Sequence, residues 1–204
     1  MTLPLPFSTS GPAIASYNFA DIISGTGYFN LYLGKTEDSN VISSLTFYSD
    51  SIWTQATIDS VTVTKAVDLD FDVTIQKTTT FEGPAIVNLP TKFRFGNGAY
   101  AGSGYHKVIL KKADVEIVSY QFDTTDGNDV TVYKMEAAKL TVPLTTFKRG
   151  DVLRVTVEGW AKVNNTGGGG CDVGFAHDPK GRLTEWDADT PSTLTIFLPT
   201  RLDI

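Results

Sequence analysis

The segment Asp68 to Gln76, DLDFDVTIQ, constrains the fold most because apolar and polar residues alternate along its whole length. A β-strand directs successive side chains to opposite faces, so the odd-numbered residues from Leu69 to Ile75 share one face. The other face carries Asp68, Asp70 and Asp72. A register shift of one residue would bury these aspartates, and burying each large apolar side chain is worth about 1.5 to 3 kcal/mol. The segment therefore predicts a half-buried strand with a fixed register.

Strand-like runs of similar composition fill most of the remaining chain. Val, Ile, Thr, Tyr and Phe dominate these runs, and clusters of Gly, Ser, Asn and Asp separate them, as is typical of β-strands and turns. The best helical candidate, Met135 to Leu140, is too short to form a stable helix. About ten to twelve short strands without a long helix indicate a sandwich or barrel. We predict an all-β fold, a jelly-roll-like antiparallel β-sandwich.

Turn and loop signals refine this prediction. Pro90 is expected at a bulge or a sheet edge, because proline cannot donate to a central ladder. The glycine-rich segment Gly96 to Gly104 is predicted to be a flexible loop, and Asp126-Gly127 a turn between two strands. The basic face of Lys107 and Lys111 is expected beside the acidic face of the Asp68 strand, either within one sheet or across a subunit contact.

Composition limits the chemistry that the chain can carry. Its 204 residues have a formal net charge of −6, one cysteine and two histidines. This excludes an internal disulfide and an ordinary Cys/His zinc site, and it argues against nucleic-acid binding through positive charge. The N-terminus lacks the pattern of a signal peptide, and no apolar run is long enough to span a membrane. We therefore predict a soluble chain made in a reducing cytoplasm, with no cofactor and no nucleic-acid or membrane partner.

The first twelve residues differ from the rest of the chain. Pro4, Pro6 and Pro12 favour an extended arm, and Leu3, Leu5 and Phe7 are too apolar for a purely solvated tail. A disordered terminus is the alternative. We predict an extended N-terminal arm over residues 1–12 and a single β-sandwich domain over residues 13–204, since no linker-like composition divides the chain.

Three groups of residues are of types that can bind a metal ion or catalyse a reaction. Asp68, Asp70 and Asp72 offer carboxylates to calcium, but alternate strand residues are about 6.6 to 7 Å apart, so a solvated acidic face is the better interpretation. Cys171 and His177 could be a catalytic pair, yet each has an obvious structural use at a strand or turn. Ser103 is not in a GxSxG nucleophile elbow. We predict no catalytic residue and no metal site.

Three segments carry a resemblance to a known class of proteins: FKRGDVLRVTVEGWAKV at residues 147–163, GFAHDPKGR at residues 174–182 and LTIFLPTRLDI at residues 194–204. With the arm and the glycine-rich loop, they resemble β-rich virion proteins of tailed bacteriophages, in particular jelly-roll capsid decoration (cement) proteins. The resemblance implies a non-enzymatic protein, commonly a homotrimer, that sits on the capsid lattice and stabilises the shell. It assigns no role to an individual residue.

We accordingly predict a virion structural protein of the decoration type, located in the virion and made in the host cytoplasm. The candidate subunit or capsid contacts are Leu3, Leu5, Phe7, Trp160 and Trp186. The alternative is a carbohydrate-binding module or receptor-binding adhesin that stacks sugars on Tyr100, Tyr105, Trp160 or Trp186. A third hypothesis, an enzyme on a cupin-like scaffold, is weakened because two isolated histidines do not make a metal-binding cluster.

Light scattering after size exclusion tests the arm. We expect the full chain to be a stable trimer, and a chain starting at Ala13 to dissociate, because the arm adds buried apolar area between subunits. A monomeric mass for both chains would contradict self-assembly through the arm.

Overall fold

A computed structural model describes residues 15–16, 26–96, 101–165, 170–182 and 192–201. Strands are the main secondary structure of these residues, and no helix among them is long and apolar enough to cross a membrane. The predicted arm, residues 1–12, and its boundary lie outside the described residues. The division into arm and sandwich therefore stays a prediction.

Thirteen strands are present in the described ranges. Their bounds are β1 (Ala15–Ser16), β2 (Thr26–Lys35), β3 (Asn40–Ser43), β4 (Trp53–Ile58), β5 (Thr64–Thr74), β6 (Thr79–Phe95), β7 (Gly102–Lys112), β8 (Val115–Gln121), β9 (Thr125–Gly127), β10 (Val130–Phe147), β11 (Val152–Val163), β12 (Cys171–Ala176) and β13 (Thr195–Arg201).

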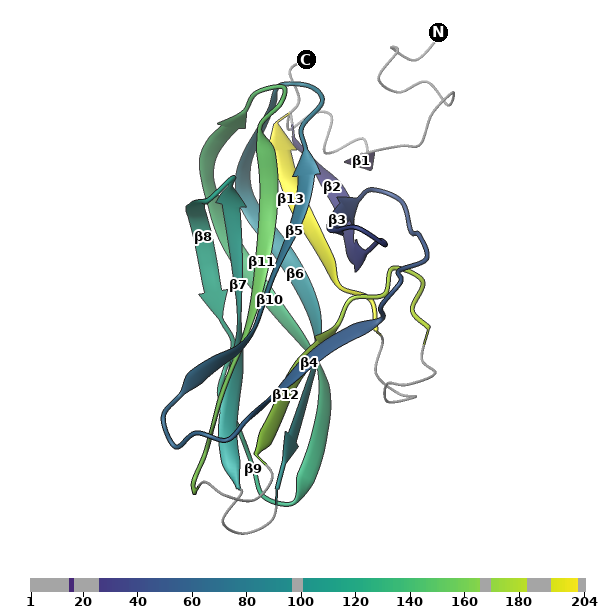
Figure 1. Cartoon of the computed structure of the whole chain (residues 1–204). Coiled ribbons are helices and arrows are strands. Elements are labelled where there is room, and N and C mark those ends of the chain that lie inside the picture. The colour runs from purple at the N-terminus through teal and green to yellow at the C-terminus, as the bar shows by residue number, and fades with distance from the viewer. Residues whose placement is uncertain (1–14, 17–25, 97–100, 166–169, 183–191, 202–204) are drawn as a thin grey trace, which may run out of the picture.

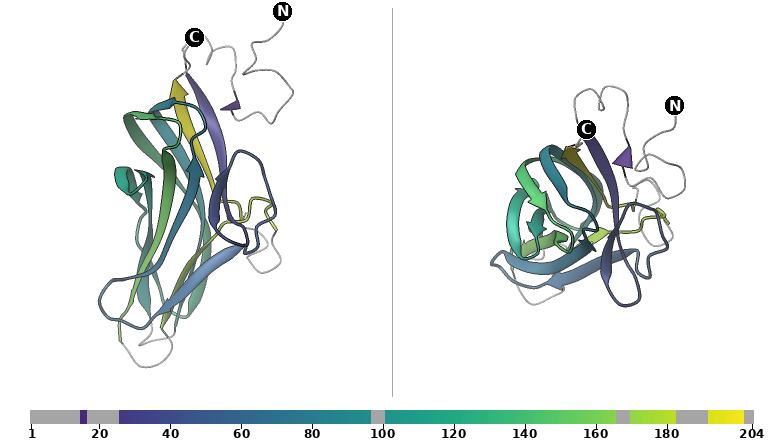
Figure 2. Two further views of the ribbon diagram at one scale, coloured as in Figure 1. Left: turned by 45° about the horizontal axis from the view of Figure 1, so that its top comes forward. Right: turned by 90° about the horizontal axis from the view of Figure 1, so that it is seen from above.

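The strands hydrogen-bond into one curled sheet in the order β4-β12-β6-β13-β2-β3-β5-β11-β7-β8, with β10 on β6, β9 on β7 and β1 on β2. Because the sheet curls, the layer around β6, β10 and β13 faces the layer of β5, β11, β7 and β8 (Figures 1 and 2). Pairing between the described strands is antiparallel except for a single parallel bridge between Val41 of β3 and Asp72 of β5. The predicted all-β, jelly-roll-like sandwich is confirmed, apart from this parallel contact.

The predicted Asp68 strand is β5, and its apolar row faces the core. Phe71 is fully buried, and Leu69, Val73 and Ile75 pack against the same cluster. On β11 the alternating residues Leu153, Val155 and Val157 are also buried. β11 lies between β5 and β7, so that Val155 is opposite Phe71 on one side and Leu110 on the other. This apolar layer holds the three strands in register.

Pro90 lies within the long strand β6 and not at the edge of the sheet. On one side β6 pairs with β10 along almost its whole length, and Pro90 is opposite Met135. On the other side β13 pairs with β6 as far as Asn88, and β12 pairs from Thr91 onward. Pro90 therefore lies at the gap between two partner strands, where its missing N–H interrupts no ladder.

Two segments differ from their predicted structure because they pair with distant strands. Gly102 to Gly104 belong to β7 and not to a flexible loop, because β9 and β11 hydrogen-bond to them from both sides. Residues 97–100 of that predicted loop lie outside the described residues. Asp126-Gly127 lies in β9, and the turn falls at Asn128 and Asp129, where Asp129 has a positive φ of 52°.

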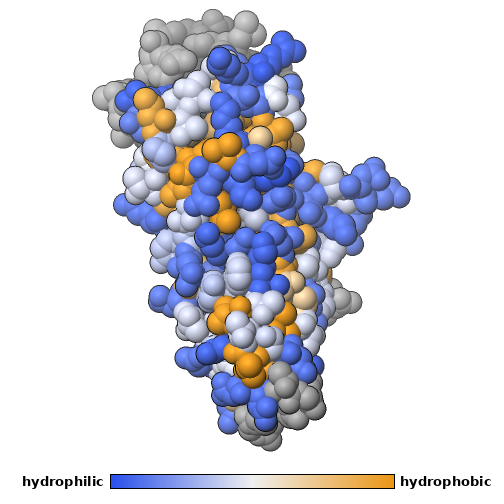
Figure 3. All heavy atoms as spheres, turned by 60° about the vertical axis from the view of Figure 1, so that its left-hand side comes forward, coloured by the Kyte–Doolittle hydropathy of each residue, from blue (hydrophilic) through white to orange (hydrophobic). Residues whose placement is uncertain are grey.

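The edge strands β8 and β10 carry exposed apolar side chains. Each has a single ladder partner within the described residues, β7 for β8 and β6 for β10. Figure 3 shows hydrophobic groups in the upper half and near the lower end of the side that carries β8. The exposed members on these two strands include Val115, Tyr120, Val130, Met135 and Leu144.

The stability of the sandwich should depend on the buried row and not on these edge residues. We expect Phe71→Ala to lower the free energy of unfolding by about 3–5 kcal/mol, because it removes a fully buried ring and leaves a cavity. The control Leu144→Ala, at a side chain that is 60% exposed, should change it by about 0.5 kcal/mol or less. Urea unfolding measures both variants. Equal losses would contradict the assignment of Phe71 to the core.

Candidate functional site

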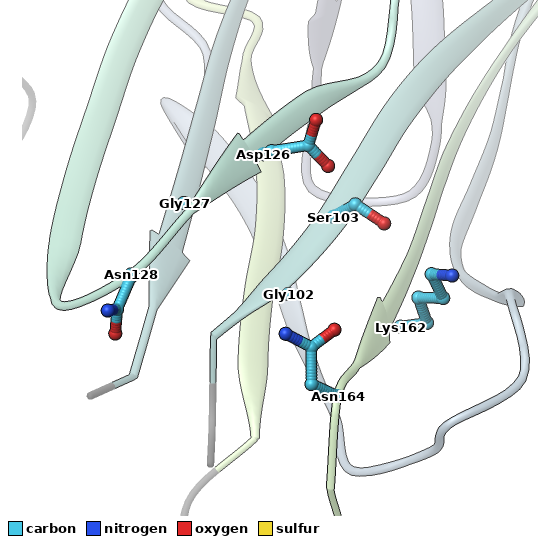
Figure 4. A pocket seen from close by; sticks show the side chains of 7 residues that line it. All are labelled: Gly102, Ser103, Asp126, Gly127, Asn128, Lys162 and Asn164. Atoms are coloured by element: carbon cyan, nitrogen blue, oxygen red, sulfur yellow. The ribbon is translucent and has the colours of Figure 1, made fainter. Parts of the chain in front are cut away.

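A polar hollow of about 520 Å³ lies at the end of the sandwich where β7, β9 and β11 meet (Figure 4). Its lining is free of large apolar side chains and consists of Gly102, Ser103, Asp126, Gly127, Asn128, Lys162 and Asn164. Ser103, Asp126, Lys162 and Asn164 surround the middle of the hollow, and the side chain of Asn128 lies at its far rim. The hollow thus gathers a hydroxyl, a carboxylate, an amine and an amide.

The register of three strands places the first three of these groups in one row. Ser103 of β7 is opposite Asp126 of β9 on one side and opposite Lys162 of β11 on the other. Directly opposite residues on antiparallel strands project to the same face, with Cβ atoms about 4.5–5.5 Å apart. A hydroxyl therefore lies between a carboxylate and an amine.

Two glycines next to Ser103 and Asp126 explain why these side chains face outward. A Cβ atom at Gly127 would lie 2.0 Å from Cδ2 of Phe95, and one at Gly104 would lie 2.5 Å from Cε1 of Phe93. Both rings are buried, and they stack with their centroids 5.7 Å apart. β7 and β9 therefore lie directly on these rings, and the residues next to the glycines turn away from the core.

Trp160 lies on the same outer face, two residues before Lys162. Its ring stacks on Tyr105 with a centroid distance of 6.0 Å, and its Nε1 donates to Oε2 of Glu158 at 2.9 Å. Lys65 holds the other carboxylate oxygen of Glu158 at 3.2 Å, and its Nζ lies 5.9 Å from the Trp160 ring centroid. Trp160 is half-buried and held by these neighbours. Its role as a subunit or ligand contact stays a prediction.

The acidic face of β5 is neutralised by neighbouring strands. Arg154 donates from Nε and Nη2 to the two carboxylate oxygens of Asp72, each at 2.7 Å, and its Nη1 lies 3.1 Å from Oδ2 of Asp70. Lys111 lies 3.8 Å from Asp70, so the basic face lies in the same sheet, with β11 between the two charged strands. No group of three metal-ligating side chains occurs among the described residues.

Cys171 and His177 lie at opposite ends of the β12 segment and have separate environments. Burial, with a smaller effect of the Asp172 charge, raises the pKa of the Cys171 thiol to about 12. Nε2 of His177 hydrogen-bonds Oγ1 of Thr54 at 2.9 Å, and burial lowers the pKa of this imidazole to about 4. Asp178 binds the guanidinium of Arg182 at 2.9 Å. The arrangement gives each residue a structural contact and does not form a catalytic pair.

The other histidine, His106, is buried inside the sandwich and does not face the hollow. Its Nδ1 lies 3.5 Å from Oε2 of Glu136, and its ring lies 4.8 Å from that of Phe93. Glu136 also holds Lys134 at 2.7 Å. Because His106 is fully buried, it cannot contact a substrate at the surface.

The sequence did not reveal the row of Asp126, Ser103 and Lys162. Ser103 lacks the nucleophile elbow, and its partners come from distant parts of the chain, so no local signal could have found it. Among the predicted contacts, Leu3, Leu5, Phe7 and Trp186 lie outside the described residues. Tyr100 of the carbohydrate-binding alternative also lies outside them.

Comparisons with solved structures find a similar fold within larger enzymes. No family model matches, and no curated protein matches. An α-amino acid ester hydrolase matches with a TM-score of 0.52 and 11% identity, over 84% of this chain and 36% of that chain. An aminopeptidase from a marine sediment archaeon, Thaumarchaeota archaeon, matches with a TM-score of 0.51 and 10% identity, over 87% of this chain and 37% of that chain. This chain spans little more than a third of the length of these enzymes, and the likeness shows the fold alone.

These matches correct the predicted function. A capsid decoration protein without enzymatic activity was expected, but the matches with a TM-score above 0.5 are hydrolases. The VP2 capsid protein of infectious bursal disease virus matches with a TM-score of only 0.29 and 9% identity, over 81% of this chain and 42% of that chain. Of the expected resemblance to virion proteins, the comparisons show only this weak likeness to a viral capsid protein. The homotrimer, the capsid partner and the virion location stay predictions.

The buried His177 should make stability depend on pH. Its pKa is lowered in the folded chain from 6.5 to about 4, so the unfolded chain binds a proton more readily, and folding loses up to about 3 kcal/mol as the pH falls from 6.5 to 4. We expect His177→Gln to remove this part of the acid sensitivity. Urea unfolding of the wild type and of His177→Gln at pH 7 and pH 4 measures the loss of unfolding free energy in each. An equal loss in both proteins would contradict the assignment.

Proposed function

We propose that the chain hydrolyses ester or amide bonds, with Ser103 as the nucleophile. The observation that carries this proposal is the row of Asp126, Ser103 and Lys162 in a polar hollow of about 520 Å³. The names of the two matching enzymes, an ester hydrolase and an aminopeptidase, support the choice of ester and amide bonds. The hollow places a serine hydroxyl in the same row as an amine that can accept its proton, at a site open to a ligand.

The reaction needs four proton transfers at Lys162, two during acylation of Ser103 and two during deacylation. The neutral amine of Lys162 takes the proton of Ser103 as Oγ attacks the carbonyl carbon, and the C–O or C–N bond then breaks. The leaving alcohol or amine receives that proton from Lys162. Water then attacks the acyl group on Ser103 while Lys162 takes a proton from the water. The bond between the acyl carbon and Oγ breaks, Lys162 returns the proton to Oγ, and a carboxylic acid is released. Ser–Lys pairs are an established variant of the nucleophile–base arrangement.

Asp126 and Asn164 have supporting roles in this scheme. Asp126 lies on the other side of Ser103 from Lys162, where its negative charge favours the ammonium that forms during attack. The side chain of Asn164 reaches into the hollow and offers an amide donor for the developing oxyanion. The backbone N–H of Asn164 donates to the carbonyl of Ala101 at 2.8 Å, which holds this residue beside the start of β7.

Hydrolysis of p-nitrophenyl acetate and of aminoacyl p-nitroanilides tests the proposal. We expect Ser103→Ala and Lys162→Met each to lower kcat/KM by at least about 100-fold, because each removes a group that bonds or carries a proton in the transition state. Mass spectrometry after quenching should find the acetyl group on Ser103.

Matched controls are Ser119→Ala and Lys139→Met, which change the same residue types elsewhere on β8 and β10. Both should keep wild-type activity. The proposal is wrong if the wild-type chain hydrolyses none of these substrates, or if it remains active after both Ser103→Ala and Lys162→Met.

A further inference from the structure

A second polar cluster lies on the outer face of the other layer, away from Ser103. Four strands contribute one residue each to a single row, in which Gln55 of β4 is opposite Gly174 of β12, Gly174 is opposite Lys92 of β6, and Lys92 is opposite Tyr133 of β10. Trp53 begins β4 two residues before Gln55, and β4 and β12 lie side by side in Figure 1. We call Trp53, Gln55, Lys92, Arg94 and Tyr133 the Lys92 cluster.

Aromatic rings and a neutral acceptor surround the ammonium of Lys92. Its Nζ lies 4.6 Å from the ring centroid of Trp53 and 5.7 Å from that of Tyr133, and it donates to Oε1 of Gln55 at 3.0 Å. Gly174 lets Gln55 and Lys92 meet across β12, because a Cβ atom there would lie 2.6 Å from Cβ of Gln55. No carboxylate of the described residues forms an ion pair with Lys92.

Lys92 is half-buried, and Asp172, the carboxylate whose charge acts on it, is already ion-paired with Arg94. Burial is the main cause that lowers the pKa of Lys92, and the nearby charge of Arg94 lowers it further, against an opposing effect of Asp172. An anion next to Nζ would offset the cost of burying this charge. The neutral amide of Gln55 now stands where a carboxylate would bind better.

Arg94 adds a second positive charge to the same face. It is two residues from Lys92 on β6, and its Nε lies 3.0 Å from Oδ2 of Asp172. Thr57 donates to the other oxygen of this carboxylate at 2.6 Å, and the Arg94 side chain remains 62% exposed. Asp172 is thus ion-paired with Arg94, and it is the carboxylate whose charge also acts on Lys92, on a chain whose net charge is −6. This local excess of positive charge favours an anionic ligand.

We infer that the Lys92 cluster binds a small organic carboxylate with an apolar body. The ligand carboxylate replaces the amide of Gln55 as the acceptor for Lys92, and Arg94 supports it from the next position along β6. The exposed parts of the Trp53 and Tyr133 rings contact the apolar body and favour it over acetate. This site lies on a different layer from Ser103 and does not depend on the proposed hydrolysis.

Titration of the full chain with benzoate, acetate and benzamide tests this inference. The readouts are the NMR signals of the Trp53 indole N–H and the Gly174 amide, and isothermal calorimetry. We expect benzoate to shift both signals saturably and to bind at least tenfold more tightly than acetate or benzamide. Binding should weaken as the pH rises through the lowered pKa of Lys92, because the ammonium then loses its charge.

Three variants separate a binding role from a merely structural one. Lys92→Gln should weaken benzoate binding at least tenfold, Lys92→Arg should retain it because the charge stays, and Lys139→Gln on the exposed face of β10 should leave it unchanged. Unfolding curves check that each variant is folded. Binding of benzamide as tight as that of benzoate, or unchanged binding by Lys92→Gln, would overturn the inference. Equal binding of acetate and benzoate would overturn the apolar part of the assigned ligand.

Discussion

The pairing of β11 with β5 and β7 is the constraint on which the rest of the structure depends. Its inward residues Leu153, Val155 and Val157 are fully buried, so a shift by one residue would place charged side chains in the core. The same register then decides every contact on the outer face. It brings Arg154 opposite Asp72, Trp160 beside Tyr105 and Lys162 opposite Ser103. The apolar row is therefore the physical cause of the polar site.

Charged side chains on the two layers of the sandwich have different kinds of partners. On β5 and β11 the carboxylates have close partners: Arg154 binds both Asp70 and Asp72, and Lys65 binds Glu158. On β6 the ammonium of Lys92 faces aromatic rings and a neutral amide. Paired surface charges mainly set register and contribute little to stability. The half-buried ammonium of Lys92 forms no ion pair with a carboxylate of the described residues, so we expect an anion to improve its environment.

Much of the fold could be predicted because alternation is a local property. The apolar row of the Asp68 strand faces the core as the sequence predicts, and strands fill most of the described chain. The errors have one cause, which is pairing with distant strands. Met135 to Leu140 has a helical composition but extends as part of β10, because β6 pairs with it throughout. Pro90 is accommodated inside a central strand because two partner strands meet beside it.

The sequence by itself determined that the chain forms strands, which side chains face the core, and that no disulfide contributes, because alternation and residue counts need no knowledge of neighbours. Only the tertiary structure decided which strands pair, and therefore which polar residues meet. Ser103, Asp126 and Lys162 share a row because β9, β7 and β11 are neighbours. Gln55 and Lys92 meet for the same reason across Gly174. Such contacts join residues far apart in the chain, and strand order comes from the packing of the whole core.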